Sequence, residues 1–514
     1  MIILNSEQTK ALENAMVEAG GEHIKLMETA GIAVARFIHE KYGVDGQAIA
    51  VICGTGNNGG DGFAAAKKLL EGGARVRIIL ASGTPKTDDA FDLLGRSERA
   101  GIKVLDFSKE GEREEIHKTI DASDILVDAV YGTGFHGEIR EEIGELFQSI
   151  NISSATVISV DIPSGVNADT GEAEEHCIKA NCTITFTTMK PGHIIFPGAE
   201  YCGLVYTSAI GIEPPLVKTE NGVLEAIDYQ TVRLCFNPRK ANTHKGTYGK
   251  LLCICGSFNM SGAAVYSAKA AVQSGVGLVK LAAPKSAIPA IASQLCDGVF
   301  VPLEENEDGF ISERAKRKLS DLLEEDISAC LIGCGIGTDS GTASVVRHVI
   351  EHSRVPVVID ADALNCIAGD TSVLKRALAP LIITPHPGEM SRLCEADTAD
   401  IQKRRLASAR EFAEKHENVT VVLKGANTII ADKEHTLINL TGNPGMAKGG
   451  SGDVLAGIIA SFAAQGMSPA DAAMCGVYLH GAAGDLASKK FSLHSMTPMD
   501  IVLSLPALFL EIER

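Results

Sequence analysis

One aspartate of this sequence has a setting that suits catalysis. Asp453 lies in "GGSGDVLAGIIASF", at the head of an apolar helical pattern and directly after a glycine-rich turn. One interpretation is a helix cap, because the start of a helix favours negative charge. The other is an anion site in which the turn binds phosphate while the carboxylate acts as a base. The whole segment "TGNPGMAKGGSGD" favours the second, since a cap needs no such long glycine-rich approach.

Two further strand ends in the same half carry polar side chains. "ITPHPGEMSRL" puts His386 between two prolines, which hold its backbone rigid, and "VVLKGANTII" puts Lys424 just before a glycine. A strand-end lysine is a natural phosphate contact. The alternatives are a loop histidine with satisfied hydrogen bonds and a solvated lysine at a turn.

The N-terminal half has its own glycine-rich turn, in "CGTGNNGGDGFAAAKKL". Glycines allow close backbone approach, and the following helix start attracts anions. The spacing is not that of the dinucleotide fingerprint G-x-G-x-x-G, and no Walker lysine follows. A tight turn capped by Asn57, Asn58 and Asp61 is the structural alternative, but the segment holds more asparagine and glycine than a turn requires.

Carboxylates follow two more apolar runs of this half: Asp128 in "VDAVYGTGFHG" and Asp161 in "SVDIPSGVNADTG". The carboxyl ends of parallel strands meet at one edge of a sheet, so these segments and the glycine-rich turn should converge. Asn58, Asp128 and Ser164 could supply oxygen ligands to a hard cation. Asp161 could act as an acid or a base.

The elements that position these residues alternate along the chain as in an α/β protein. After helical patterns near the N-terminus, continuous apolar runs such as "AIAVICG", "DILVDAVYG" and "ATVISVDIPSG" are separated by helices, which predicts a parallel sheet covered on both faces. The two prolines and polar residues of Ile212 to Gly222 predict a domain boundary. A second, longer alternating series follows, giving domains at 1–215 and 225–514.

Composition excludes several classes of function. A net charge of −18 over 514 residues argues against non-specific nucleic-acid binding, so any phosphate site must use local donors. The thirteen cysteines are an odd number and most lie in apolar runs, which favours buried thiols over a metal pair at Cys253 and Cys255. No signal peptide or membrane span is expected, and we predict a cytoplasmic protein.

The N-terminal motifs "GTGNNGGDG", "VDAVYGTGFHG" and "VDIPSGVNADTG", in this order, resemble the NAD(P)H-hydrate epimerase family over most of residues 1–215. The resemblance implies a Rossmann-like domain that interconverts the R and S epimers of hydrated NAD(P)H, with Asp161 as its catalytic candidate. It also implies potassium ligands at Asn58, Asp128 and Ser164. The implied substrate contacts are Asn57, Asn58, Gly59, Gly60, Asp61, Gly132, Thr133, Gly134, Phe135, His136, Gly137, Glu138 and Asp161.

The C-terminal motifs "GSFNMSGAAVYSAKAAVQSGVGLV", "GCGIGTD", "IDADAL", "TPHPGEM", "KGANT" and "NPGMAKGGSGDVLAG" resemble the NAD(P)H-hydrate dehydratase family from about residue 225 to the C-terminus. The resemblance implies a larger, ribokinase-like domain that dehydrates the S epimer and converts ADP to AMP and phosphate, with Asp453 as the base. The implied substrate contacts are Ala264, Gly335, Gly337, His386 and Asp453. The implied nucleotide contacts are Lys424, Gly425, Ala426, Asn427, Thr428 and Gly452.

The two resemblances in one chain predict a bifunctional enzyme acting on hydrated NADH or NADPH, with ADP preferred to ATP, magnesium on the nucleotide and no membrane or nucleic-acid partner. We expect a homo-oligomer, as is common for such enzymes. One alternative is a vitamin or sugar kinase with an N-terminal nucleotide-sensing domain; a stable phosphorylated product would favour it. Another is a binding protein without catalysis, in which replacing Asp161 or Asp453 would change nothing.

Overall fold

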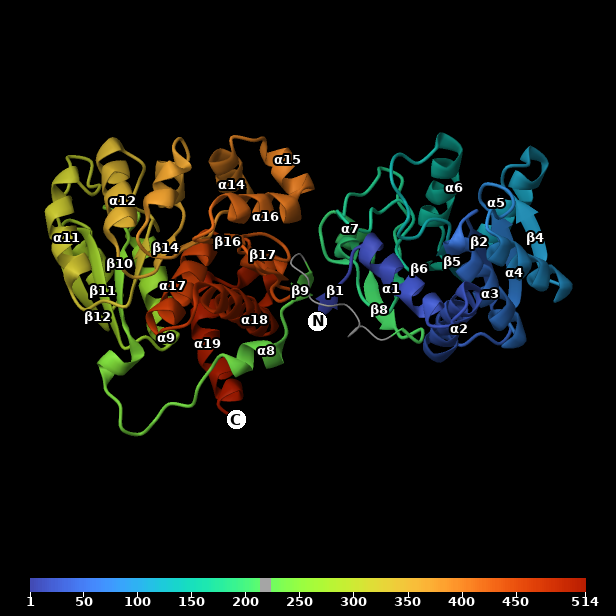
Figure 1. Ribbon diagram of the computed structural model, residues 1–514, viewed down its shortest axis with the longest axis horizontal. Helices are drawn as coiled ribbons and strands as arrows, with labels where there is room; N and C mark the ends of the chain where they lie inside the picture. Colours follow the sequence, from blue (N-terminus) through green and yellow to red (C-terminus); the bar gives the residue numbers. More distant parts are fainter. Residues whose placement is uncertain (213–222) are drawn as a thin grey trace. The chain divides into compact units, whose positions relative to one another are not determined.

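A computed structural model of the chain describes residues 1–212 and 223–514, which form two compact units (Figure 1). One unit comprises Ile2–Val223, and the other comprises Leu224–Arg514 together with Met1. Each is built on a sheet whose strands are mainly parallel, with helices between them, so the predicted α/β class is confirmed. Of the segment in which we expected the domain boundary, residues 213–222 lie outside the described part of the chain.

The strands of the first unit pair in the order β4-β3-β2-β5-β6-β7-β8, and all of them are parallel. The chain order therefore reverses between β2 and β5, and in open α/β sheets ligands bind at such a point, beyond the carboxyl ends of the strands. The strands are β2 (Ala48–Cys53), β3 (Arg75–Leu80), β4 (Lys103–Asp106), β5 (Ile125–Ala129), β6 (Thr156–Val160), β7 (Cys182–Phe186) and β8 (Leu204–Ser208), and the short β1 is Ile2–Ile3.

Both faces of this sheet are buried, as its continuous apolar runs predict. Alternate residues of β2 enter different cores: Ile49 and Val51 pack with the first four helices, whereas Ala50 and Ile52 pack with α5 and α6. The helices are α1 (Ser6–Glu18), α2 (His23–Tyr42), α3 (Asn57–Glu71), α4 (Asp88–Arg99), α5 (Arg113–Asp121), α6 (Glu141–Ile152) and α7 (Gly198–Tyr201).

The second unit repeats this topology in a larger sheet. From β9 its strand order runs β9-β18-β17-β16-β15-β14-β13-β10-β11-β12, and its chain order reverses between β10 and β13. Only β17 is antiparallel to its neighbours among these strands. The strands are β9 (Leu224–Ala226), β10 (Lys250–Ile254), β11 (Leu278–Pro284), β12 (Gly298–Leu303), β13 (Ala329–Ile332), β14 (Val357–Ile359), β15 (Leu381–Ile383), β16 (Val419–Leu423), β17 (Ile429–Ala431) and β18 (Thr436–Ile438).

One face of the larger sheet is covered by α9, α17, α18 and α19 (Figure 1). Apolar side chains of these helices form a single core with the sheet. The helices of this unit are α8 (Tyr229–Leu234), α9 (Ser261–Gln273), α10 (Ile288–Ala292), α11 (Lys316–Glu324), α12 (Ser340–His352), α13 (Asp362–Ile367), α14 (Pro387–Cys394), α15 (Thr398–Lys403), α16 (Arg405–Lys415), α17 (Ser451–Ala464), α18 (Pro469–Ser495) and α19 (Pro498–Ile512).

Helix α17 begins at the glycine-rich turn around Asp453 and is held closely against α9. A Cβ atom added to Gly457 would lie 2.1 Å from the carbonyl oxygen of Ser267, so the two helix backbones touch there. From Val454 to Ala464 every residue of α17 is buried, as expected of a helix that is apolar on all sides. No helix in the described ranges is both long and apolar enough to cross a membrane.

Candidate active sites

The first candidate site lies where the strand order of the first unit reverses. Helix α3 begins at Asn57, a few residues after β2, and its first-turn N–H groups have no acceptor within the helix. Gly59 must be small, because a Cβ there would lie 2.2 Å from the carbonyl oxygen of Gly54. Gly60 is buried beside Met27. This helix start therefore lies directly against the end of β2, with its first-turn N–H groups at the carboxyl ends of the strands.

Asp161, directly after β6, is held by a buried ion pair. Lys190 donates to Asp161 Oδ1 at 2.6 Å, and Thr185 Oγ1 donates to the same atom at 3.0 Å. The lysine also donates to Thr185 Oγ1 and to the carbonyl oxygen of Phe186. Burial alone would raise the pKa of Asp161, but the charge and hydrogen bond of Lys190, together with His193 and Thr185, outweigh burial and hold that pKa below its usual value. Asp161 is therefore ionised at neutral pH.

His193 fixes the backbone of Asp161. Its Nδ1 accepts from the N–H of Lys190 at 2.9 Å, so its Nε2 carries the proton and donates to the carbonyl oxygen of Asp161 at 2.7 Å. Burial and the nearby Lys190 lower the pKa of His193 to about 4, which keeps the ring neutral. Asp161 itself has a positive φ of 65°, a strained conformation of the kind found at functional sites.

Two more carboxyl groups, those of Asp61 and Glu13, interact electrostatically with this ion pair. Burial, together with the carboxylates of Asp161 and Glu13, raises the pKa of Asp61 well above its ordinary value. Burial and Asp161 also raise the pKa of Glu13, which lies on α1. The site thus combines one ionised carboxylate with carboxyl groups that hold protons more strongly, a pairing that suits proton transfer.

Asn58, Asp128 and Ser164 lie at the same strand ends. Asp128, only 1% exposed, accepts from Ser164 Oγ at 2.5 Å, from Ser164 N–H at 2.9 Å and from Ser159 Oγ at 2.8 Å. Burial raises the pKa of Asp128. Both polar atoms of the Asn58 amide are buried and have no hydrogen-bond partner among the described residues. An orphaned buried amide beside buried oxygens fits an oxygen-binding cation such as K⁺.

The segment after β5 contributes less to this centre. A Cβ on Gly132 would lie 3.1 Å from the Asn58 side chain, which brings these two residues together. Phe135 stacks on Tyr131 with ring centroids 4.9 Å apart, and His136 Nδ1 lies 3.3 Å from Asn167 Nδ2. No hydrogen bond or ion pair within residues 1–212 joins the remaining members of the segment to the Asp161 centre; these are Thr133, Gly134, Gly137 and Glu138.

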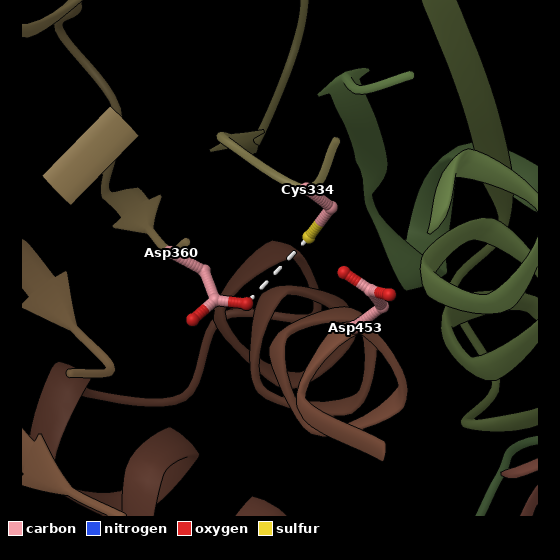
Figure 2. A group of neighbouring side chains, drawn as sticks. All are labelled: Cys334, Asp360 and Asp453. Atoms are coloured by element: carbon pink, nitrogen blue, oxygen red, sulfur yellow. Dashed lines mark hydrogen bonds between the residues drawn. The ribbon is translucent and has the colours of Figure 1, made fainter. Parts of the chain in front are cut away.

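The second candidate site lies at the carboxyl ends of four neighbouring strands of the larger sheet. Cys334 follows β13 and Asp360 follows β14, and both face Asp453 at the start of α17 (Figure 2). The thiol sulfur and one oxygen of each carboxylate all lie within 4.8 Å of one another. Burial, and then the neighbouring Asp360, raise the pKa of Asp453 to about 7. Asp453 can therefore take up a proton near neutral pH, as a general base must.

Lys424, directly after β16, completes this group. Its Nζ lies 2.7 Å from Asp360 Oδ1 and 3.6 Å from Glu389 Oε2. Burial alone would lower the pKa of Lys424, but these two carboxylates outweigh burial and raise it. A Cβ on Gly452 would lie 3.4 Å from Lys424 Nζ. The structure thus brings together Lys424, Gly452 and Asp453, with two free first-turn N–H groups of α17 beside an ammonium.

His386 has a structural task in addition to any ligand contact. Its Nδ1 accepts from the N–H groups of Gly388 and Glu389, and Glu389 accepts from the N–H of His386, which forms a capping box at the start of α14. The side chain is 52% exposed, and its Nε2 lies 3.4 Å from Glu389 Oε1.

Three residues expected to contact substrate lie at the reversal between β10 and β13. Gly335 and Gly337 have positive φ angles of 66° and 81°, and Cβ atoms there would meet Ala263 and Phe310 respectively. The N–H of Gly337 donates to Asp362 at 2.9 Å. Ala264 is fully buried and packs against Gly256, so its side chain fills the core.

The sequence comparisons divide the chain in the same way. A family model described as NAD(P)H-hydrate dehydratase matches residues 251–507, and one described as the N-terminus of YjeF-related proteins matches residues 23–192. A bifunctional NAD(P)H-hydrate repair enzyme from Moorella thermoacetica is 38% identical over 495 residues, which are 96% of this chain and 93% of the relative. The chain belongs to this family. A relative of the same name from Thermofilum pendens is 35% identical, and the match covers 98% of this chain and 96% of the relative.

Among solved structures, an ADP/ATP-dependent NAD(P)H-hydrate dehydratase from Bacillus subtilis, co-crystallised with ATP and Mg²⁺, is 31% identical with a TM-score of 0.49. The match covers 56% of this chain and 99% of that one. A protein from Streptococcus mutans is 27% identical with a TM-score of 0.50, and the match covers 56% of this chain and 100% of that one.

Membership in the NAD(P)H-hydrate repair family gives the chain its activities. It is a bifunctional enzyme, an NAD(P)H-hydrate epimerase and an NAD(P)H-hydrate dehydratase. The unit of Ile2–Val223 is Rossmann-like and the unit that contains residues 251–507 is ribokinase-like. The predicted family, fold and pair of activities are therefore confirmed.

Sequence reasoning did not identify several partners within the two sites. Lys190 lies in "TTMKPGH", after the strand run "CTITF", and its position at a strand end was the available signal. Asp360 lies in "IDADAL", which was recognised as a motif without a role for the residue. Nothing in the sequence around Cys334 indicates that its thiol faces two carboxylates.

Proposed function

We propose that residues 1–215 carry the epimerase activity with Asp161 at its centre, and that residues 225–514 carry the dehydratase activity with Asp453 as its base. The observation that carries this assignment is the pair of strand-end centres, each with one buried lysine bound to one aspartate. The two centres differ in the position of the proposed catalytic aspartate. Asp161 is itself paired with Lys190, whereas Asp453 lies next to the pair formed by Lys424 and Asp360.

Epimerisation at C6 of the hydrated nicotinamide can proceed by ring opening: the C6 hydroxyl loses its proton as the C6–N1 bond breaks and N1 gains a proton, and the ring then closes on the opposite face. One group must then accept a proton while another donates one. Asp161, kept ionised by Lys190, supports the accepting role, and Asp61, whose pKa is raised by burial and by neighbouring carboxylates, supports the donating role. The helix start at Asn57–Asp61 and the segment Gly132–Glu138 would bind the rest of the substrate.

Dehydration is difficult because hydroxide is a poor leaving group, and phosphorylation of the C6 hydroxyl makes elimination feasible. Asp453, with a pKa of about 7, would take the hydroxyl proton. The first-turn N–H groups of α17 and the Lys424 ammonium would stabilise the phosphoryl oxygens. Gly335, Gly337, Ala264 and His386 would contact the hydrated nucleotide, and Lys424–Thr428 with Gly452 would contact ADP.

The carboxylates of this centre fit a magnesium ion bound together with the nucleotide phosphates. Asp360 Oδ1 accepts hydrogen bonds from Lys424 and Thr384, whereas among the described residues Asp360 Oδ2 has only the weak Cys334 thiol donor, at 3.8 Å. Asp360 Oδ2 would therefore hold Mg²⁺, which prefers oxygen ligands and would neutralise phosphate charge. A hydrogen bond with Cys255, together with burial, raises the pKa of Cys334, so its thiol is a poor ligand for this ion.

Potassium is our proposal for the first unit. The orphaned amide of Asn58, with Asp128 and Ser164, would hold K⁺ near the substrate, where the ion would offset negative charge. We further propose that ADP is preferred to ATP, that the enzyme is a homo-oligomer, and that it works in the cytoplasm. The thirteen cysteines, all free, support the last point.

The decisive experiment follows near-ultraviolet absorbance of a mixture of R and S hydrated NADPH with the protein, Mg²⁺, K⁺ and ADP. We expect the reduced-nicotinamide signal to return beyond the S fraction. Asp453→Asn should abolish recovery, whereas Asp161→Asn should leave recovery of the S epimer and slow that of the R epimer. A stable phosphorylated product without recovery would favour a kinase instead.

A further inference from the structure

Arg405, the first residue of α16, has an unusual environment for an arginine. It is only 3% exposed, and its guanidinium binds three backbone carbonyl oxygens of one turn. Nη1 donates to the carbonyl of Ala426 at 2.6 Å, and Nη2 lies 3.4 Å from the carbonyls of both Leu423 and Lys424. The turn is the segment that joins β16 to β17, which we name the 423–426 turn.

No carboxylate of the described residues forms an ion pair with Arg405. Burial lowers the pKa of this guanidinium to about 10, so it remains charged at neutral pH. A buried charge without a counter-charge is costly, and here the carbonyl dipoles of the turn are what compensate it. We therefore interpret the buried arginine as a residue that fixes the conformation of the 423–426 turn.

Holding these carbonyls also orients an N–H group. In a trans peptide the C=O and N–H of one unit point in opposite directions, so the N–H of Gly425 points away from the guanidinium that binds the Lys424 carbonyl. Gly425 and Ala426 are exposed, and the N–H of Gly425 has no acceptor in the described part of the chain. Lys424 N–H, by contrast, is bonded to the carbonyl of Pro385 at 2.8 Å.

The contact with Arg405 also explains why residue 425 is a glycine. Gly425 has a φ of 146°, and a Cβ there would lie 2.7 Å from Arg405 Nη2. A side chain at this position would be both strained and in collision with a guanidinium that is fixed on its other side. The bound guanidinium of Arg405 therefore requires a glycine at position 425.

We propose that Arg405 is a positioning residue of the nucleotide site: by binding the carbonyls of the 423–426 turn, it presents the Gly425 N–H and the Lys424 side chain to the phosphates of ADP. The inference rests on the proposed nucleotide site. Arg405 touches no reacting atom, and its effect is on affinity for the nucleotide.

The test measures the Kd of Mg²⁺-ADP by calorimetry, and the KM for ADP and kcat of dehydration, for the full chain. Losing charge-assisted bonds to the turn should raise the Kd and KM for ADP about tenfold or more in Arg405→Met. The KM for the hydrated nucleotide and kcat at saturating ADP should change much less. Arg405→Lys should show an intermediate loss, and added guanidinium ion should partly restore ADP affinity to Arg405→Ala.

Arg410→Met is the matched control, because Arg410 lies on the same helix and donates instead to Thr436 Oγ1 at 2.9 Å. Its Kd for ADP should stay within about twofold of the wild-type value, as for an independent site. Wild-type ADP affinity in Arg405→Met, or in Arg405→Lys if the first variant does not fold, would overturn the inference. An equal loss in Arg410→Met would also overturn it. A wild-type chain that neither binds nor uses ADP would instead overturn the proposed nucleotide site.

Discussion

The ammonium of Lys190 lies 2.6 Å from the carboxylate of Asp161, and its side chain is only 1% exposed. Because the Asp161 side chain is also only 12% exposed, each charge is stabilised mainly by its partner rather than by solvent. The pair therefore links the epimerase chemistry that we propose for Asp161 to the stability of the first unit. Removing Lys190 should therefore reveal the effect of burial alone on the pKa of Asp161 and on stability.

Lys190→Met should destabilise the first unit by about 3–5 kcal/mol at pH 7, because it leaves a buried carboxylate unpaired. The pKa of Asp161 should then rise, since burial is no longer opposed. A carboxyl group whose pKa is higher in the folded state stabilises that state as the pH falls, so the stability difference from wild type should narrow between pH 7 and pH 5. Urea unfolding at several pH values, followed by a probe in the first unit, measures this.

The double variant Lys190→Met with Asp161→Asn is the control for that prediction. It removes both charges, so most of the lost stability should return while epimerisation stays low. Dehydration of the S epimer should continue at the wild-type rate in every one of these variants. A double variant as unstable as Lys190→Met would mean that the lost stability comes from packing of the lysine side chain rather than from its charge.

The two activities should respond differently to acid. Asp453 has a pKa of about 7 and must be ionised to act as a base, so kcat/KM for dehydration should fall about tenfold per pH unit below pH 7. Asp161 has a lowered pKa and stays ionised, so epimerisation should persist to about pH 5. Both rates are measured on one preparation from pH 5 to pH 9. Parallel acid limbs would contradict the assignment of Asp453.

Gly452→Ala should raise the KM for ADP about tenfold. The new methyl group would sit 3.4 Å from Lys424 Nζ, an ordinary contact, so the chain should fold normally. The methyl would nevertheless occupy the space between the ammonium and the helix start, where phosphate oxygens are expected. Gly449→Ala is the matched control, since a Cβ there meets nothing within 4 Å, and its KM should be unchanged.

Removing K⁺ should slow epimerisation and leave dehydration unchanged. Asn58→Ala should raise the KCl concentration that gives half-maximal epimerisation about tenfold, because it removes one of a few oxygen ligands. The measurement is the epimerisation rate against KCl at constant ionic strength, with choline chloride as the balancing salt. An unaltered KCl dependence in Asn58→Ala would show that the orphaned amide serves another group.

Much of the fold could be predicted because it depends on local patterns. Continuous apolar runs between helices indicate parallel strands, and a parallel sheet brings its strand ends to one edge. Asp161, Asp128 and Asp453 could be selected for the same reason, since each lies at the carboxyl end of a strand or in the first turn of a helix, close to glycines. The physics that selects these residues acts over a few positions of the chain.

The partners of these residues could not be predicted, because they come from distant segments. Lys190 and Asp161 are joined only after β6 and β7 pair, and Asp360 meets Lys424 across 64 positions of sequence. Arg405 was harder still: in "IQKRRLAS" it is one of three consecutive basic residues, which is typical of a solvated helix face. Its burial follows from the way α16 packs beside β16, and no short-range pattern reports that.

The close approach of α17 to α9 has a consequence for how this enzyme can lose activity. Gly457 touches the backbone of Ser267 and lies four positions beyond Asp453, one helical turn away. Any larger residue at 457 must push the helix outward, and the displacement would carry the aspartate with it. The position of Asp453, our proposed base, is thus set by a backbone contact between α17 and α9 that lies outside the site. A substitution at Gly457 should therefore abolish dehydration even though Asp453, Asp360 and Lys424 all keep their side chains.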